Sequence, residues 1–102
     1  MVIGLVVSGC AASNITKVQN KQGPPGDVLQ KENVKIYYYY KYYGEGWQHW
    51  GWYGWQFTCD KDGNIIQKRE YWIGNNDLFK EFRGMIKQGT DPVEALFPIH
   101  NR

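Results

Sequence analysis

The chain has 102 residues, of which 42% are hydrophobic, and a formal net charge of +2 at pH 7. A chain of this length forms a single domain that buries roughly two thirds of its unfolded surface, so we expect one hydrophobic core and no room for a second. The charges are spread along the sequence without a long basic run, which argues against a nucleic-acid groove.

The first ten residues are uncharged and mostly apolar, whereas a membrane-spanning helix needs about 20 apolar residues. Val7-Ser8-Gly9-Cys10 matches the lipobox of bacterial lipoproteins, in which an aliphatic residue, a small residue and Gly or Ala precede the cysteine that receives diacylglycerol. We interpret residues 1–9 as a partial lipoprotein signal segment, residues 10–14 as a lipid tether and Cys10 as the lipid attachment site. The alternative is a buried strand over residues 1–7 with Cys10 as a core thiol.

The two cysteines leave a second alternative open. In a periplasmic protein Cys10 and Cys59 can form a disulfide. If Cys10 carries lipid instead, Cys59 is a lone thiol that packs in the core as a small hydrophobic side chain, and we favour this second arrangement.

The first element expected after the tether is a short helix over residues 15–22. Ile15 and Val18 lie on one face of it, and Ser13 or Asn14 serves as the N-cap. Gly23-Pro24-Pro25-Gly26 ends this helix, because Gly suits the position after a helix and Pro cannot continue one. Residues 27–33 are expected to lead into the first strand.

Residues 36–57 hold 12 of the chain's 17 aromatic side chains and are predicted to form two strands joined by a glycine-containing loop. In the first strand the even-numbered positions are expected to face the core, because the odd-numbered positions include Lys35 and Lys41. Rings outside the core are candidate partner-binding residues: Tyr37, Tyr39 and Tyr43 on the first strand, Trp47 in the loop, and Trp50 and Trp52 on the second strand.

Residues 60–64, Asp-Lys-Asp-Gly-Asn, are predicted to form the turn of a second hairpin. The alternative is a calcium loop with ligands at Asp60, Asp62 and Asn64, but such a loop needs glycine at its sixth position and glutamate at its twelfth. Those positions hold Ile65 and Tyr71. The third strand, over residues 65–73, mixes polar and apolar residues and is expected to expose much of its surface.

An amphipathic helix is predicted over residues 77–88, because its apolar residues repeat with the period of one helix face. Asp91-Pro92-Val93-Glu94 then predicts a further short helix over residues 93–97. The expected fold is therefore α+β, a single domain over residues 15–99. In this fold a three-stranded antiparallel meander has a short N-terminal helix, and the amphipathic C-terminal helix packs on one face.

The sequence contains no metal or catalytic motif that we recognise. The two histidines are His49 and His100, and no His-x-His, Cys-x-x-Cys or Glu-x-x-His spacing is present. Gly44-x-Gly46 lacks the third glycine of a dinucleotide fingerprint. A thiol–base pair of Cys59 and His49 has no evident third residue to orient it. We expect no enzyme activity, no metal and no cofactor.

The order of elements resembles that of the SmpA/OmlA family of small outer-membrane lipoproteins, which includes the BamE subunit of the β-barrel assembly machinery. The resemblance rests on Ile15-Thr-Lys-Val18-x-x-Lys21-x-Gly23-Pro24-Pro25, the aromatic strand over residues 36–43, and Phe57-x-x-Asp60-x-Asp62-Gly63. The family's longer helical region ahead of the sheet is reduced here to residues 15–22. The resemblance implies a lipid-anchored α+β module on the periplasmic side of the outer membrane, which binds other envelope components without catalysis. Ala11 after the cysteine is compatible with sorting to the outer membrane.

Two functional hypotheses follow for the aromatic residues. In the first, exposed rings of an envelope adaptor contact another protein or lipid headgroups, since Tyr and Trp combine apolar area with a polar group. In the second, Trp47, Trp50 and Trp52 offer flat faces to sugar rings in a carbohydrate- or peptidoglycan-binding module. A third interpretation is that most rings fill the core and the remainder lie singly on the surface.

Overall fold

The computed structural model describes residues 13–45 and 49–97 and contains three helices and four strands. In chain order the elements are α1 (Ile15–Gln22), β1 (Asp27–Gln30), β2 (Lys35–Glu45), β3 (His49–Cys59), β4 (Ile65–Ile73), α2 (Asn76–Lys87) and α3 (Pro92–Leu96). The α+β class and both main helices match the sequence prediction.

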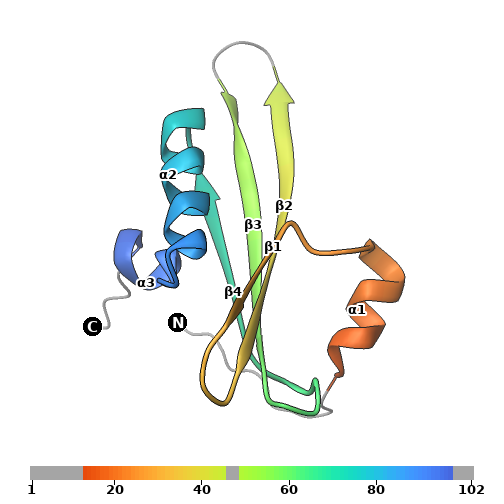
Figure 1. Ribbon diagram of the computed structural model, residues 1–102. Helices are drawn as coiled ribbons and strands as arrows, with labels where there is room; N and C mark the ends of the chain where they lie inside the picture. The colour runs from red at the N-terminus through yellow and green to blue at the C-terminus, as the bar shows by residue number, and fades with distance from the viewer. Residues whose placement is uncertain (1–12, 46–48, 98–102) are drawn as a thin grey trace, which may run out of the picture.

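All four strands form one antiparallel sheet in the order β1-β2-β3-β4 (Figure 1). The prediction of three strands is wrong, because part of the segment expected to lead into the first strand forms a strand of its own, β1. β1 has four residues, of which Leu29 alone is buried, so it carries no hydrophobic alternation that would reveal a strand. It pairs with Lys35–Tyr38, the first part of the much longer β2.

The β2–β3 hairpin is the longest feature of the sheet, with eleven residues in each strand and register from Lys35 opposite Cys59 to Glu45 opposite His49. At its other end β3 joins β4 through the predicted turn. The Asp60 carboxylate accepts hydrogen bonds from the backbone N–H groups of Asp62 and Asn64, both at 2.9 Å, and Gly63 has a φ of 87°. The hydrogen bonds from these N–H groups lower the pKa of Asp60. The Asp60 carboxylate that would be a calcium ligand therefore already accepts hydrogen bonds within the turn.

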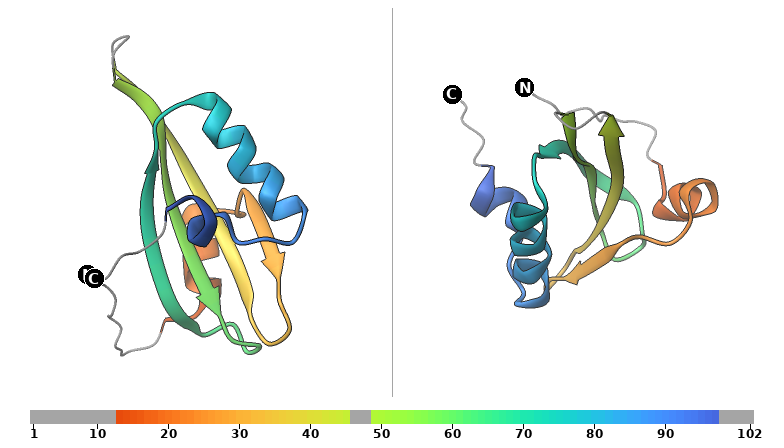
Figure 2. Two further views of the ribbon diagram at one scale, coloured as in Figure 1. Left: turned by 90° about the vertical axis from the view of Figure 1, so that its left-hand side faces the viewer. Right: turned by 90° about the horizontal axis from the view of Figure 1, so that it is seen from above.

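One face of the sheet is covered by α2 and α3 (Figure 2). The N-caps are Asn75 for α2 and Asp91 for α3. The sequence pattern favours Asn76 or Asp77 as the cap of α2, so the helix begins slightly earlier than expected, whereas Asp91 is the expected capping residue of α3. The predicted stripe of α2 does face the core. The buried residues of this cluster, here called the α2-side core, are Leu29, Ile36, Tyr38, Tyr71, Ile73, Phe82, Ile86 and Val93.

The opposite face carries a second buried cluster beneath α1, contrary to the expectation of one core. This α1-side core consists of Ile15, Tyr39, Phe57 and Cys59, with Val18, Tyr37, Trp55 and Ile65 packed around it. Hydrogen bonds hold α1 to the sheet: Ile15 N–H donates to the Gly63 carbonyl at 2.8 Å, and the Tyr39 hydroxyl donates to the Gly23 carbonyl at 3.0 Å. Both sheet faces are therefore partly buried, each by its own helices.

Candidate functional site: an open aromatic surface

Two of the predicted partner-binding tyrosines lie under α1. Tyr39 is only 5% exposed, and its ring packs edge-on against Phe57 with centroids 5.9 Å apart. Tyr37 is half-buried beside the same cluster. The prediction of exposure for Tyr39 is wrong, because it assumed that the face bearing Lys35 and Lys41 was solvated along its whole length.

Trp50 and Trp52 lie on the other face, on the α2 side, and both are half-buried. Trp52 stacks on Phe79 of α2 at a centroid distance of 4.1 Å and an interplanar angle of 8°, and its Nε1–H donates to the Asn76 side chain at 3.1 Å. Trp52 therefore packs α2 against the sheet, and the ring face that contacts Phe79 is not free to bind a ligand. Trp47 and Cys10 lie outside the described residues.

Tyr43, by contrast, is exposed as predicted, at 48%. It belongs to a group of rings on the α1 side of the sheet. α1 lies beside only one end of this face (Figure 1), and the group extends from Trp55, at the margin of the α1-side core, toward the other end. The Tyr43 ring lies 6.3 Å from Trp72 of β4, and Tyr53 lies 4.8 Å from Trp55 on β3. We call Tyr43, Tyr53, Trp55 and Trp72 the open aromatic surface.

Trp72 owes its position to a glycine on the neighbouring strand. A Cβ atom built at Gly51 would lie 2.6 Å from Cζ2 of Trp72, so the indole extends across the β3 backbone at a place where no side chain intervenes. Trp72 nevertheless remains 47% exposed. The sequence prediction missed Trp72, because its neighbourhood depends on the β3–β4 register, which the sequence pattern does not specify.

Charged groups surround these rings. Lys41 Nζ lies 5.5 Å from the centroid of Tyr43, and the Tyr53 hydroxyl donates a hydrogen bond to Glu70. Glu70 also forms an ion pair with Lys68 at 3.2 Å. The hydrogen bond from Tyr53 and then the Lys68 charge lower the pKa of Glu70, while that same bond raises the pKa of Tyr53. An apolar centre with a charged rim is typical of a contact surface.

A hollow of about 320 Å³ adjoins the open aromatic surface through Trp55. It lies beside β2, between the end of α1 and the β2 edge, and its lining residues are Gln22, Pro24, Gly26, Tyr39, Tyr40, Lys41 and Trp55. None of these lining residues is acidic. The hollow extends the contact surface without suggesting a reaction.

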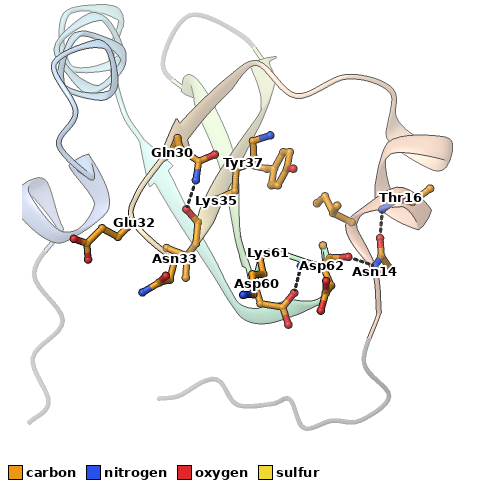
Figure 3. A pocket seen from close by; sticks show the side chains of 13 residues that line it. Asn14, Thr16, Gln30, Glu32, Asn33, Lys35, Tyr37, Asp60, Lys61 and Asp62 are labelled. Atoms are coloured by element: carbon orange, nitrogen blue, oxygen red, sulfur yellow. Dashed lines mark hydrogen bonds between the residues drawn. The ribbon is translucent and has the colours of Figure 1, made fainter.

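A second hollow, of about 360 Å³, lies at the other end of the sheet, beside the start of α1 (Figure 3). Two of its polar side chains already have partners: Asn14 caps α1 through Thr16 N–H at 3.0 Å and donates to the Asp62 carbonyl at 3.2 Å, while the Asp60 carboxylate accepts from Asp62 N–H within its own turn. Within residues 13–45 and 49–97, no three His, Cys, Asp or Glu side chains form a group suited to a metal ion.

The thiol–base alternative conflicts with the positions of its two residues. His49 and Cys59 occupy opposite ends of β3, about 33 Å apart for ten residue steps along a strand. Cys59 is fully buried, and burial raises the pKa of its thiol to about 11. At neutral pH it stays protonated and packs as part of the α1-side core, as the sequence analysis favoured. Whether Cys10 pairs with Cys59 falls outside the described residues.

The helices that the structure describes are too short or too polar to cross a bilayer. Comparison with protein-family models, curated proteins and solved structures finds no match for this chain.

Proposed function

We propose that this chain is a non-catalytic binding module of the bacterial cell envelope. In this proposal a lipid on Cys10 attaches it to the periplasmic side of the outer membrane, and it contacts another envelope protein through the open aromatic surface. A role in the assembly of outer-membrane β-barrel proteins would fit the resemblance to the SmpA/OmlA family. The single observation that carries the proposal is the set of neighbouring rings that α1 leaves uncovered on a sheet face that is buried only near its other end.

The energetic argument concerns the exposed rings. Contiguous exposed apolar area is unfavourable in water and on monomeric proteins often marks an interaction site. Tyr and Trp supply large contact area with few rotatable bonds, so less conformational entropy is lost on binding. Lys41 and the Lys68–Glu70 pair at the rim provide charges that can orient a partner.

The position of the surface agrees with a tethered module. The Ser13 carbonyl accepts a hydrogen bond from Ile65 N–H at 2.9 Å, so the described chain begins next to the β3–β4 turn. Three peptide units connect Cys10 to Ser13, which limits their Cα separation to about 11 Å. Trp72 lies seven residues further along β4 than Ile65, about 23 Å away. The surface is thus separated from the attachment point by much of the sheet's length.

Mass spectrometry of the membrane-extracted protein tests the attachment. We expect a chain that begins at a diacylated Cys10, and a Cys10→Ser variant that is released into the soluble fraction. A soluble wild-type product with an unmodified Cys10 would contradict the proposed location and would remove the main support from the family resemblance.

A second candidate function, sugar binding, is favoured by the geometry of Trp72. Its indole extends across Gly51 and is 47% exposed, beside the charged rim of Lys68 and Glu70. A flat exposed ring next to hydrogen-bonding groups suits a sugar ring. The platform would then be Trp72 with Tyr43, in place of the three tryptophans expected from the sequence.

Titration of intrinsic tryptophan fluorescence with soluble peptidoglycan fragments separates the two functions. Sugar binding predicts saturable quenching that Trp72→Ala abolishes and that Trp50→Ala, on the other sheet face, retains. The adaptor function predicts no saturable change for any of the three proteins. Quenching that survives in Trp72→Ala would exclude this platform as the sugar site.

A further inference from the structure

One long edge of the sheet is only half covered. β1 pairs with residues 35–38 of β2, whereas β2 continues to Glu45. Over residues 39–45, no strand in the described part of the chain pairs with the outer edge of β2. Figure 1 shows β2 extending well past the end of β1 toward the β2–β3 loop. We call residues 39–45 the free edge of β2.

The direction of the backbone groups on this edge follows from one hydrogen bond. Gly26 N–H donates to the Tyr38 carbonyl at 2.8 Å, so the backbone polar groups of Tyr38 point away from β3. In an antiparallel sheet the backbone N–H and C=O groups of successive residues point alternately toward the strand on one side and the strand on the other. The N–H and C=O groups of Tyr40, Tyr42 and Gly44 therefore point outward, while those of Lys41 and Tyr43 point toward β3.

The free edge has few of the features that usually prevent edge-to-edge pairing. Sheets protect their edges with charges, prolines, bulges or short strands. β1 is short, and β4 carries Lys68, Arg69 and Glu70 in succession. The free edge has no proline, and its charged residues are Lys41 and Glu45, with tyrosines and a glycine between them. Tyr42 is 51% exposed.

We propose that the free edge of β2 pairs antiparallel with the free edge of a second copy of this chain, about a two-fold axis through Tyr42. In this register Tyr42 faces its own counterpart, and Tyr40 faces Gly44 of the second copy. Each residue whose backbone groups point away from β3 then lies opposite another such residue. All the unpaired backbone N–H and C=O groups of Tyr40, Tyr42 and Gly44 thereby form hydrogen bonds. In each copy β1 already pairs with residues 35–38 of β2, directly beyond the free edge. The presence of β1 therefore limits the length of the segment that can pair between the two copies.

The side chains fit the same register. Lys41 faces Tyr43 of the second copy, and its ammonium group already lies 5.5 Å from the centroid of its own Tyr43. Each lysine would thus lie between two aromatic rings and never opposite another lysine. The two-fold axis is perpendicular to the sheet, so the open aromatic surfaces of both copies adjoin on one face and stay accessible. The pairing goes beyond the proposed function and does not depend on it.

Analytical ultracentrifugation of the full chain tests the pairing with two variants of one residue. Tyr42→Pro removes the outward N–H and leaves the β2–β3 hydrogen bonds in place, as proline on an edge strand does. Tyr42→Ala removes the same ring and keeps the N–H. We expect a concentration-dependent monomer–dimer equilibrium for the wild type, a dissociation constant at least tenfold higher for Tyr42→Pro, and a smaller increase for Tyr42→Ala.

Residue-resolved amide hydrogen exchange of the wild type tests the register without any variant. We expect the amides of Tyr40, Tyr42 and Gly44 to become protected as concentration rises, and those of Lys41 and Tyr43 to be protected at all concentrations. Three results would overturn the proposal: a monomer at every concentration, exchange at Tyr42 that is independent of concentration, or dimerisation of a folded Tyr42→Pro variant as tight as that of the wild type.

Discussion

At the scale of single residues, Asp91 is the polar centre of the α2-side core. Its Oδ1 accepts hydrogen bonds from the Tyr38 hydroxyl at 2.9 Å and the Gln56 side chain at 2.8 Å, and also from Val93 N–H at 3.1 Å. Arg69 approaches its Oδ2 at 3.8 Å. Tyr38 is 0% and Gln56 1% exposed, so water cannot replace the carboxylate without a rearrangement.

Asp91→Ala should lower the free energy of unfolding by about 3 kcal/mol, because it leaves buried donors without an acceptor and removes the α3 cap. Chemical denaturation measures the change. Glu94→Ala is the matched control: Glu94 is exposed, and among the described residues its side chain bonds only to Arg69, at 3.3 Å, so its loss should cost about 0.5 kcal/mol or less. Equal effects of the two substitutions would show that Asp91 is not the centre of this network.

Three core tyrosines should make the fold sensitive to alkali. Burial raises the pKa of Tyr38, Tyr40 and Tyr71 above the ordinary value near 10, and carboxylates close to Tyr38 and Tyr40 add to the effect. Above pH 10 the unfolded chain releases these protons while the folded chain keeps them. Stability present below that pH is therefore lost as pH rises, by up to about 1.4 kcal/mol per pH unit for each tyrosine.

Urea denaturation between pH 8 and pH 11 measures this loss, and Tyr71→Phe is the informative variant. The Tyr71 hydroxyl is buried and makes no hydrogen bond with the described residues. Removal of this hydroxyl should leave the free energy of unfolding at pH 8 unchanged or raised. Above pH 10 the free energy of unfolding should fall less steeply with pH, by the contribution of one titrating tyrosine. A slope unchanged in Tyr71→Phe, or stability that rises with pH, would show that this tyrosine does not carry the effect.

At the scale of secondary-structure elements, the packing of β3 against β4 depends on Gly54. A Cβ atom at Gly54 would lie 2.2 Å from Cε2 of Tyr71, whose ring is held against Phe82 at 5.0 Å and Phe97 at 5.7 Å. The glycine therefore lets a core ring lie directly over the neighbouring strand. Gly84 in α2 has no such neighbour, since a Cβ there meets nothing within 4 Å.

The two glycines predict opposite effects of the same substitution. Gly54→Ala should destabilise the protein by about 2 kcal/mol, because Tyr71 must leave its position in a packed core. Gly84→Ala should stabilise it by about 0.5–1 kcal/mol, because alanine favours a helix interior and restricts the unfolded chain. Thermal unfolding of both variants measures the difference. A stabilised Gly54→Ala protein would show that Tyr71 moves aside at no cost.

Local sequence signals predict the helices and the ends of the hairpins. They do not predict that both faces of the sheet are partly buried. The bounds of α1 agree with the prediction, and α2 begins only one residue early, because caps and apolar periodicity act within a few residues. The burial of Tyr39 depends on where α1 packs, which is a long-range contact. Ile15 and Val18 on one face of α1 were the available signal, since apolar residues on a short helix need a surface to cover.

The functional surface was predicted only in part for the same reason. The position of Tyr43 on the same strand face as Lys41 predicts its exposure. Trp72 lies 29 residues further along the chain and becomes its neighbour only through the register of three strands. The strand pattern alone predicts exposure for Trp52. Its partner in the structure, Phe79, lies on a helix whose packing the strand pattern does not specify. Pairwise contacts between distant elements therefore decide which rings are free.

At the scale of the whole molecule, the sheet lies between two unequal layers (Figure 2). On one side α2 and α3 pack over the α2-side core, and on the other α1 covers only the end near the β3–β4 turn. The uncovered end carries the open aromatic surface, and the described chain begins at the opposite end. This asymmetry separates the proposed attachment from the proposed contact.

Site-specific photo-crosslinking in intact cells tests the central claim most directly. A benzophenone amino acid replaces Trp72 or Tyr43 on the open aromatic surface, and Lys80, exposed on α2, in the control. The account predicts a discrete adduct with another protein in the membrane fraction from positions 72 and 43, and none from position 80. Adducts of equal yield from all three positions, or an adduct from position 80 alone, would contradict it.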